Sequence, residues 1–127
     1  MRKLLAVTAW VEVSTGVALI AAPGPVVSLL AGAVLDTAGW LVARVAGAAL
    51  LALGLACWLA RNDGRRPATL GLVAAMLLYN LMAAALLVHA GISLQLTAIG
   101  LWPAVALHVA LALWCVICLK AEVAPSV

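Results

Sequence analysis

The sequence predicts an all-α membrane protein, an up-down bundle of four transmembrane helices with a short interfacial segment on its outer side. The first indication is composition: of 127 residues, 69% are hydrophobic and 9% are charged, which is too little charge for the surface of a soluble domain. The second is the presence of four apolar stretches, each close to the roughly 20 residues that a membrane-spanning helix needs. The third is that the basic residues gather on one side of the resulting four-span arrangement.

The four stretches cover residues 4–22, 39–60, 68–90 and 98–119, and with their loops they form a single domain over 1–127. Backbone groups in lipid must be bonded within helices or a closed barrel, and the alternation that a barrel strand requires is absent. The first stretch follows Arg2 and Lys3, as in a signal peptide, but it is longer than a signal core and contains Glu12. We therefore expect it to remain as the first transmembrane helix.

Residues 23–38 form the only sizeable loop. Pro23 and Pro25 end the first helix, since proline cannot continue the backbone ladder. Residues 26–35 are apolar but too short to span, so we expect them to lie at the outer interface or over the mouth of the bundle. Asp36 is a candidate N-cap for the second span.

The second and third spans are joined by residues 61–67, which contain the turn signal Asp63-Gly64. Pro67 suits the first turn of the helix that follows. Because the connection is short, we expect these two helices to be antiparallel neighbours. Residues 91–97 form a similarly short turn on the other side.

Charge and tryptophan positions predict the orientation. One side of the four-span arrangement carries six basic residues: Arg2, Lys3, Arg61, Arg65, Arg66 and Lys120. Positive charge marks the cytoplasmic side, so we expect a multi-pass protein of the inner (plasma) membrane with both termini in the cytoplasm. The net charge of +3 then reports topology and not nucleic-acid binding. Four tryptophans fall near the span ends, as an aromatic belt requires: Trp40 and Trp102 outside, Trp58 and Trp114 inside.

Each span also carries a polar residue that lipid disfavours: Glu12, Arg44, Asn80 and His108. Glu12, Asn80 and His108 fall near the midplane. At 1.5 Å per residue, Glu12 and His108 lie about 15 Å from the outer ends of their helices, while Arg44 is about 7 Å inside. Buried ionisable residues usually face the interior of a bundle and mark functional sites. The candidate ligand-binding or proton site comprises Glu12, Arg44, Asn80, His108, the adjacent Tyr79, and Trp10, the one tryptophan outside the belt.

Two interpretations of these residues are open. In one, Glu12 and Arg44 form an interhelical ion pair, and Asn80 and His108 hold the bundle together by hydrogen bonds, each worth about 0.6 kcal/mol in lipid. In the other, the residues bind the polar head of a quinone or lipid, or pass a proton. We expect access to such a site from the outer leaflet, with Arg44 on that side.

Cofactor chemistry has few candidates. A haem ligated by two histidines is disfavoured, because His89 lies roughly 13 Å above His108 along the bundle. The weak metal or thiol candidates are Cys57, Cys115 and Cys118. Cys115-Val-Ile-Cys118 has the spacing of redox and metal motifs, but in an apolar helix cysteine usually serves as a small hydrophobic residue.

Three stretches resemble small four-helix bacterial inner-membrane proteins, broadly similar to the DoxX-like group: Ala43-Arg44-Val45-Ala46-Gly47 through Trp58, Leu78-Tyr79-Asn80, and Gly100-Leu101-Trp102-Pro103 through His108. The resemblance implies the fold and no activity. We expect a non-enzymatic protein that binds a hydrophobic small molecule, lipid or quinone, or an accessory subunit of a membrane complex. The alternatives are a proton-coupled transporter or channel subunit, built as a homo-oligomer, and a membrane thiol/quinone redox enzyme.

Overall fold

The computed structural model describes residues 1–64 and 66–123, and all regular structure among them is α-helical. The helices are α1 (Arg2–Ala21), α2 (Pro23–Ala31), α3 (Thr37–Ala60), α4 (Pro67–Ile92) and α5 (Leu101–Val123). Four of them, α1, α3, α4 and α5, are long and apolar enough to cross a membrane. The predicted all-α class and the four long apolar segments are therefore confirmed. Arg65, which entered the charge count, lies outside the described residues.

The helix ends follow the expected local chemistry. Asp36 is the N-cap of α3, where its Oδ1 accepts a hydrogen bond of 2.7 Å from the backbone N–H of Gly39. Pro23 and Pro67 occupy the first turns of α2 and α4, where a missing N–H costs no hydrogen bond. α2 stops at Gly32, whose φ of 65° is a left-handed conformation that favours glycine.

The first packing unit is the antiparallel pair of α1 and α3. A Cβ on Gly16 would lie 2.7 Å from the carbonyl oxygen of Gly47, and one on Gly54 would lie 3.1 Å from that of Ala9. Only glycine allows the backbones to come this close, and small residues are how helices pack tightly in lipid. Because Gly47 meets Gly16 and Gly54 meets Ala9, the start of α1 lies beside the end of α3.

The second unit is the antiparallel pair of α4 and α5. Gly91, near the end of α4, lies against Leu101 and Trp102 at the start of α5. Further along, the Asn80 and His108 side chains are hydrogen-bonded between the two helices. The buried positions of α4 recur at helical spacing and form the face toward this contact: Thr69, Val73, Met76, Asn80 and Ala84.

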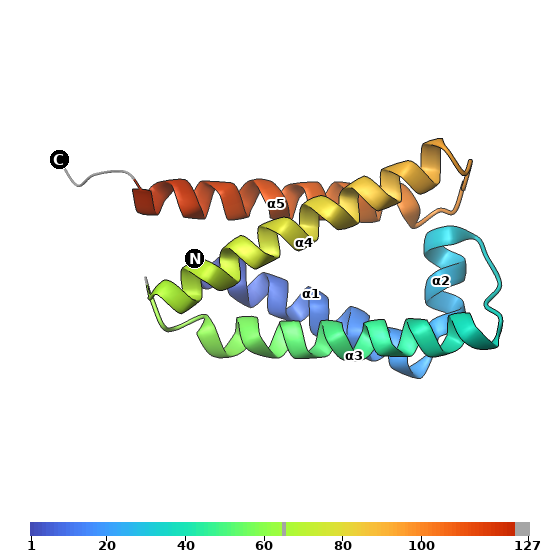
Figure 1. Ribbon diagram of the computed structural model, residues 1–127, viewed down its shortest axis with the longest axis horizontal. Helices are drawn as coiled ribbons and strands as arrows, with labels where there is room; N and C mark the ends of the chain where they lie inside the picture. The colour runs from blue at the N-terminus through green and yellow to red at the C-terminus, as the bar shows by residue number, and fades with distance from the viewer. Residues whose placement is uncertain (65, 124–127) are drawn as a thin grey trace.

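One prediction about packing is wrong. The second and third spans, α3 and α4, were expected to be neighbours because a short turn joins them, yet they make few contacts and diverge from that turn (Figure 1). The physical reason is that α1 already covers the small-residue face of α3 that includes Ala43, Gly47 and Gly54. α4 therefore crosses toward α5 (Figure 1).

The two pairs meet at both ends of the molecule. At one end, α2 lies across the bundle beside the turn between α4 and α5 (Figure 1), and the Gly100 N–H donates a 3.0 Å hydrogen bond to the Leu29 carbonyl. Toward the other end, all four long helices contribute to one buried core: Leu4, Leu5, Ala9, Cys57, Val73, Met76, Leu111, Cys115 and Cys118. The polar residues Thr8 and Glu12 share the buried face of α1 with this core.

Candidate functional site

Five polar side chains gather between the two helix pairs, and we call them the polar cluster: Thr8 and Glu12 from α1, Tyr79 and Asn80 from α4, and His108 from α5. Thr8, Glu12 and Asn80 are almost completely buried, with exposed fractions of 0%, 1% and 0%. Tyr79 and His108 are half-buried. The predicted midplane residues Glu12, Asn80 and His108, together with Tyr79, thus lie in one region.

The Asn80 amide sets the state of His108. Its Nδ2 donates to the backbone carbonyl of Met76 at 2.8 Å, which leaves Oδ1 as the atom that faces Nδ1 of His108, also at 2.8 Å. An amide oxygen only accepts, so Nδ1 of the imidazole carries the proton and donates. In the neutral ring the remaining nitrogen, Nε2, is then an acceptor.

Tyr79 connects this pair to α1. Its ring meets the His108 ring edge to face, with centroids 5.7 Å apart and an interplanar angle of 80°, an arrangement that aromatic rings prefer. Its hydroxyl lies near the carboxyl group of Glu12. Tyr79 therefore lies between the Glu12 carboxyl group and the His108–Asn80 pair.

Two atoms of the cluster have no hydrogen-bond partner among the described residues: Oε1 of Glu12 and Oγ1 of Thr8. The two residues are one helical turn apart on the same face of α1. Leaving a buried polar atom unpaired costs about 1–3 kcal/mol, and more when the group is charged. Thr8 was not among the site residues predicted from the sequence, although its i, i+4 spacing from Glu12 places it on the same inward face.

Arg44 is not part of this cluster. Its side chain is exposed, and its guanidinium carbon lies 5.6 Å from the ring centroid of Trp40, one turn earlier on α3. Within the described part of the chain it forms no ion pair with Glu12, which is buried on the α1 face that packs inward. The structure therefore does not bring together the two residues that the sequence suggested as an ion pair.

Trp10 also lies away from the cluster. It is 68% exposed and meets Trp58 edge to face, with ring centroids 6.3 Å apart. Trp58 in turn stacks under the guanidinium of Arg61, whose Cζ is 3.5 Å from the ring centroid. Trp10 therefore belongs with the aromatic residues near the end of α3, and the Trp58-x-x-Arg61 spacing was the sequence signal for this group.

The cysteines and His89 add no second centre. Cys57, Cys115 and Cys118 are buried free thiols within the apolar core. His89 lies in the last turn of α4, whereas His108 is bonded to Asn80 deep in the α4–α5 contact. In the parts of the chain that the structure describes, no group of three or more histidine, cysteine or acidic side chains could hold a metal ion.

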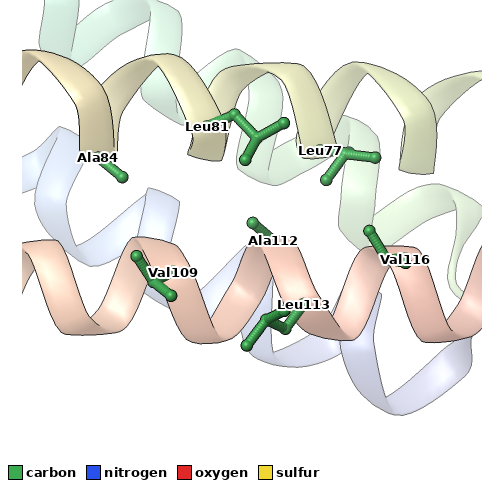
Figure 2. A pocket seen from close by; sticks show the side chains of 7 residues that line it. All are labelled: Leu77, Leu81, Ala84, Val109, Ala112, Leu113 and Val116. Carbon is green, nitrogen blue, oxygen red and sulfur yellow. The ribbon is translucent and has the colours of Figure 1, made fainter.

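Two apolar grooves lie on the outer surface of the helix pairs. One, of about 210 Å³, is lined by Ala9, Trp10, Val13 and Trp58 on α1 and α3. The other, of about 170 Å³, lies between α4 and α5, where side chains such as Leu77, Leu81 and Ala112 line the space between the two helices (Figure 2). Neither is lined by a residue of the polar cluster.

The chain matches no protein-family model, no curated protein and no solved structure. The functional argument therefore rests on the geometry of the polar cluster.

Proposed function

We propose that this chain is a non-enzymatic integral membrane protein whose polar cluster binds the head of a neutral hydrophobic molecule of the quinone or quinol type. The four long helices cross the membrane in alternate directions, with both termini in the cytoplasm and the chain in the plasma membrane. The positive-inside rule supports this orientation, because Arg2, Lys3, Arg61, Arg66 and Lys120 all flank the same ends of the four spans.

The observation that carries the proposal is the pair of unpartnered oxygens on α1. Oε1 of Glu12 and Oγ1 of Thr8 are enclosed between helices without a hydrogen-bond partner, and lipid offers them none. A ligand that bonded to both would recover the cost of burying them. A carboxyl group is a far more expensive way to pack two helices than a leucine would be, so a binding role explains its position better than a packing role.

Charge indicates which head group fits. Arg44, near the start of α3, is exposed and lies over Trp40. A phosphate or carboxylate head at the cluster would therefore be buried with no cation to hold it, and burying an unpaired charge is costly. A neutral head remains: a carbonyl can accept from Thr8 or from protonated Glu12, and a hydroxyl can donate to Nε2 of His108.

Access follows from how the helix pairs are joined. α1 and α3 are held by close backbone contact, and α4 and α5 by the Asn80–His108 bond, whereas the two pairs touch each other less. At the end that we assign to the outer leaflet, the pairs are joined through α2 and the Leu29–Gly100 hydrogen bond, whereas a buried apolar core joins them toward the other end. We therefore expect a ligand to enter from the outer leaflet, past α2.

Ligand-dependent thermal stabilisation tests the proposal. The detergent-solubilised protein is titrated with a short-chain benzoquinone, with the corresponding quinol and with phosphatidic acid. A ligand at a hundred times its dissociation constant stabilises the folded state by about 2.7 kcal/mol. We expect this for the quinone or the quinol, and a loss of affinity of about ten-fold or more in Glu12→Gln or His108→Leu.

The matched control is Asp63→Asn, which removes a carboxylate from the exposed turn between α3 and α4 and should not alter the titration. Absence of stabilisation by any of the three compounds would argue against a ligand site. Equal losses of affinity in Asp63→Asn and Glu12→Gln would show that the effect is not local to the cluster.

A second candidate is a proton-coupled transporter built as a homo-oligomer. The face of α3 that is turned away from α1 exposes Ala48 and Ala52 at i, i+4 spacing, a pattern that permits close approach of another helix in lipid. Glu12 would then be the proton carrier. Proton flux in proteoliposomes that disappears in Glu12→Gln would support this function, and a monomeric protein without flux would remove it.

A further inference from the structure

The groove between α1 and α3 ends at a cation. Ala9, Trp10 and Val13 form its α1 side and Trp58 its α3 side; its volume is about 210 Å³, and its lining is almost entirely apolar. Arg61, one turn beyond Trp58, places its guanidinium carbon 3.5 Å from the Trp58 ring centroid. In space, Trp58 therefore lies between Trp10, in the apolar lining of the groove, and the positively charged Arg61.

More positive charge lies at the same end of the molecule. Because α1 and α3 are antiparallel, with Ala9 against Gly54, the start of α1 lies beside the end of α3. Arg2 and Lys3 are exposed there. Arg61 follows directly after the last residue of α3, so it lies at the polar end of the span. Trp10 lies deeper in the span, about 12 Å along α1 from Arg2.

We propose that this groove binds an anionic glycerophospholipid from the leaflet at this end of the bundle. One acyl chain lies against Ala9, Trp10, Val13 and Trp58, and the phosphate is held by Arg61. The guanidinium already donates from Nη1 to the carbonyl of Trp58, and its other N–H groups remain to bond phosphate oxygens. Arg2 and Lys3 add a preference for a net negative head group.

A phospholipid fits these observations better than a second protein helix. The lining of the groove is apolar, which suits a hydrocarbon chain, and the Arg61 cation lies at the interfacial end, where a phosphate would be. A helix packing here would have to cover the two tryptophans, of which Trp10 is the most exposed tryptophan in the described chain at 68%. Trp58, near the end of α3, lies where tryptophans typically contact lipid near the head groups.

This site is independent of the polar cluster and can be tested separately. The protein is incorporated into nanodiscs of equal parts phosphatidylglycerol and phosphatidylcholine, released into detergent, and its retained lipids are identified by native mass spectrometry. We expect wild type to retain phosphatidylglycerol about five-fold over phosphatidylcholine, since each basic side chain near the surface contributes about that factor. Arg61→Gln should reduce the preference to the part that Arg2 and Lys3 contribute, and Trp10→Ala should reduce retention of both lipids.

The chain contains its own control. Arg44 and Trp40 form a second arginine–tryptophan contact, with 5.6 Å between the guanidinium carbon and the ring centroid, near the start of α3 and without this groove. Arg44→Gln should leave the lipid preference unchanged. Equal retention of the two lipids by wild type would overturn the proposal, as would an equal loss in Arg44→Gln. A Trp10→Ala variant that changed the oligomeric mass and not the lipid content would also overturn it, since the occupant would then be another chain.

Discussion

At the scale of single residues, the Asn80–His108 contact determines what the polar cluster can offer a ligand. The Asn80 amide is oriented by its bond to the Met76 carbonyl, and this orientation fixes the proton on Nδ1 of His108. An imidazole whose other nitrogen is an acceptor suits a ligand hydroxyl. Under the proposed function, Asn80 would act on the ligand through His108 and would be a positioning residue.

A double-mutant cycle between Asn80→Leu and His108→Leu should measure this contact. Interhelical hydrogen bonds in lipid have coupling energies of about 0.6 kcal/mol on average and up to about 1.7 kcal/mol. Because both bonds of the Asn80 side chain are 2.8 Å long and Asn80 is fully buried, we expect a value in the upper part of this range. Unfolding in mixed micelles gives the four free energies. Strictly additive single and double variants would show that the two side chains do not interact.

The Asp36 cap makes a second prediction at this scale. Asp36→Ala removes the acceptor of the Gly39 N–H at the start of α3, and loss of an N-cap typically costs about 0.5–2 kcal/mol. Hydrogen exchange at the first turn of α3 should rise correspondingly. Asp63→Ala, in the connection after α3, serves as the control and should leave the amides in the first turn of α3 protected from exchange.

At the scale of helices, the sequence predicted the elements more accurately than their partners. The predicted spans and the observed long helices agree to within three residues at each end, apart from the C-terminal end of α5, because length, hydropathy and the prolines define them locally. The cap at Asp36 was predicted for the same reason. The pairing of the helices was not predicted correctly. The short loop suggested that α3 packs on α4, whereas the small residues of α3 pack against α1.

The glycine contacts of α3 test this pairing. Gly47→Leu would place a Cβ 2.8 Å from the Gly16 carbonyl oxygen, and overpacking of this kind costs about 1–3 kcal/mol. Gly71→Leu, on α4, is the matched control, because nothing lies within 4 Å of the position that its Cβ would take. We expect Gly47→Leu to lower the unfolding temperature in detergent and Gly71→Leu to leave it unchanged or raised. Similar behaviour of the two variants would contradict the α1–α3 contact.

At the scale of the whole molecule, the cluster was only partly predictable. Glu12, Asn80, Tyr79 and His108 could be assigned to inward faces, because polar residues in a span avoid lipid. Arg44 could not, since its long side chain can reach a membrane interface from an outward face, and Trp10 was grouped by depth and not by partner. Helical spacing gives the face of each residue but not the helix that faces it.

The proposed topology makes a prediction of its own. Asp63→Cys lies in the turn between α3 and α4, and Gln95→Cys lies in the turn between α4 and α5. With the native thiols buried, a membrane-impermeant maleimide added to spheroplasts should label Gln95→Cys and spare Asp63→Cys until the membrane is opened. The reverse pattern would invert the orientation.

The most direct test of the central claim is native mass spectrometry of the protein released from its own membrane. We predict that wild type and Asp63→Asn carry one neutral, hydrophobic small molecule in addition to phospholipid, and that Glu12→Gln carries only the phospholipid, because the ligand head is held by the Glu12 carboxyl. A folded wild-type protein that retains no such molecule, or a Glu12→Gln variant that retains it as well as wild type, would contradict the account.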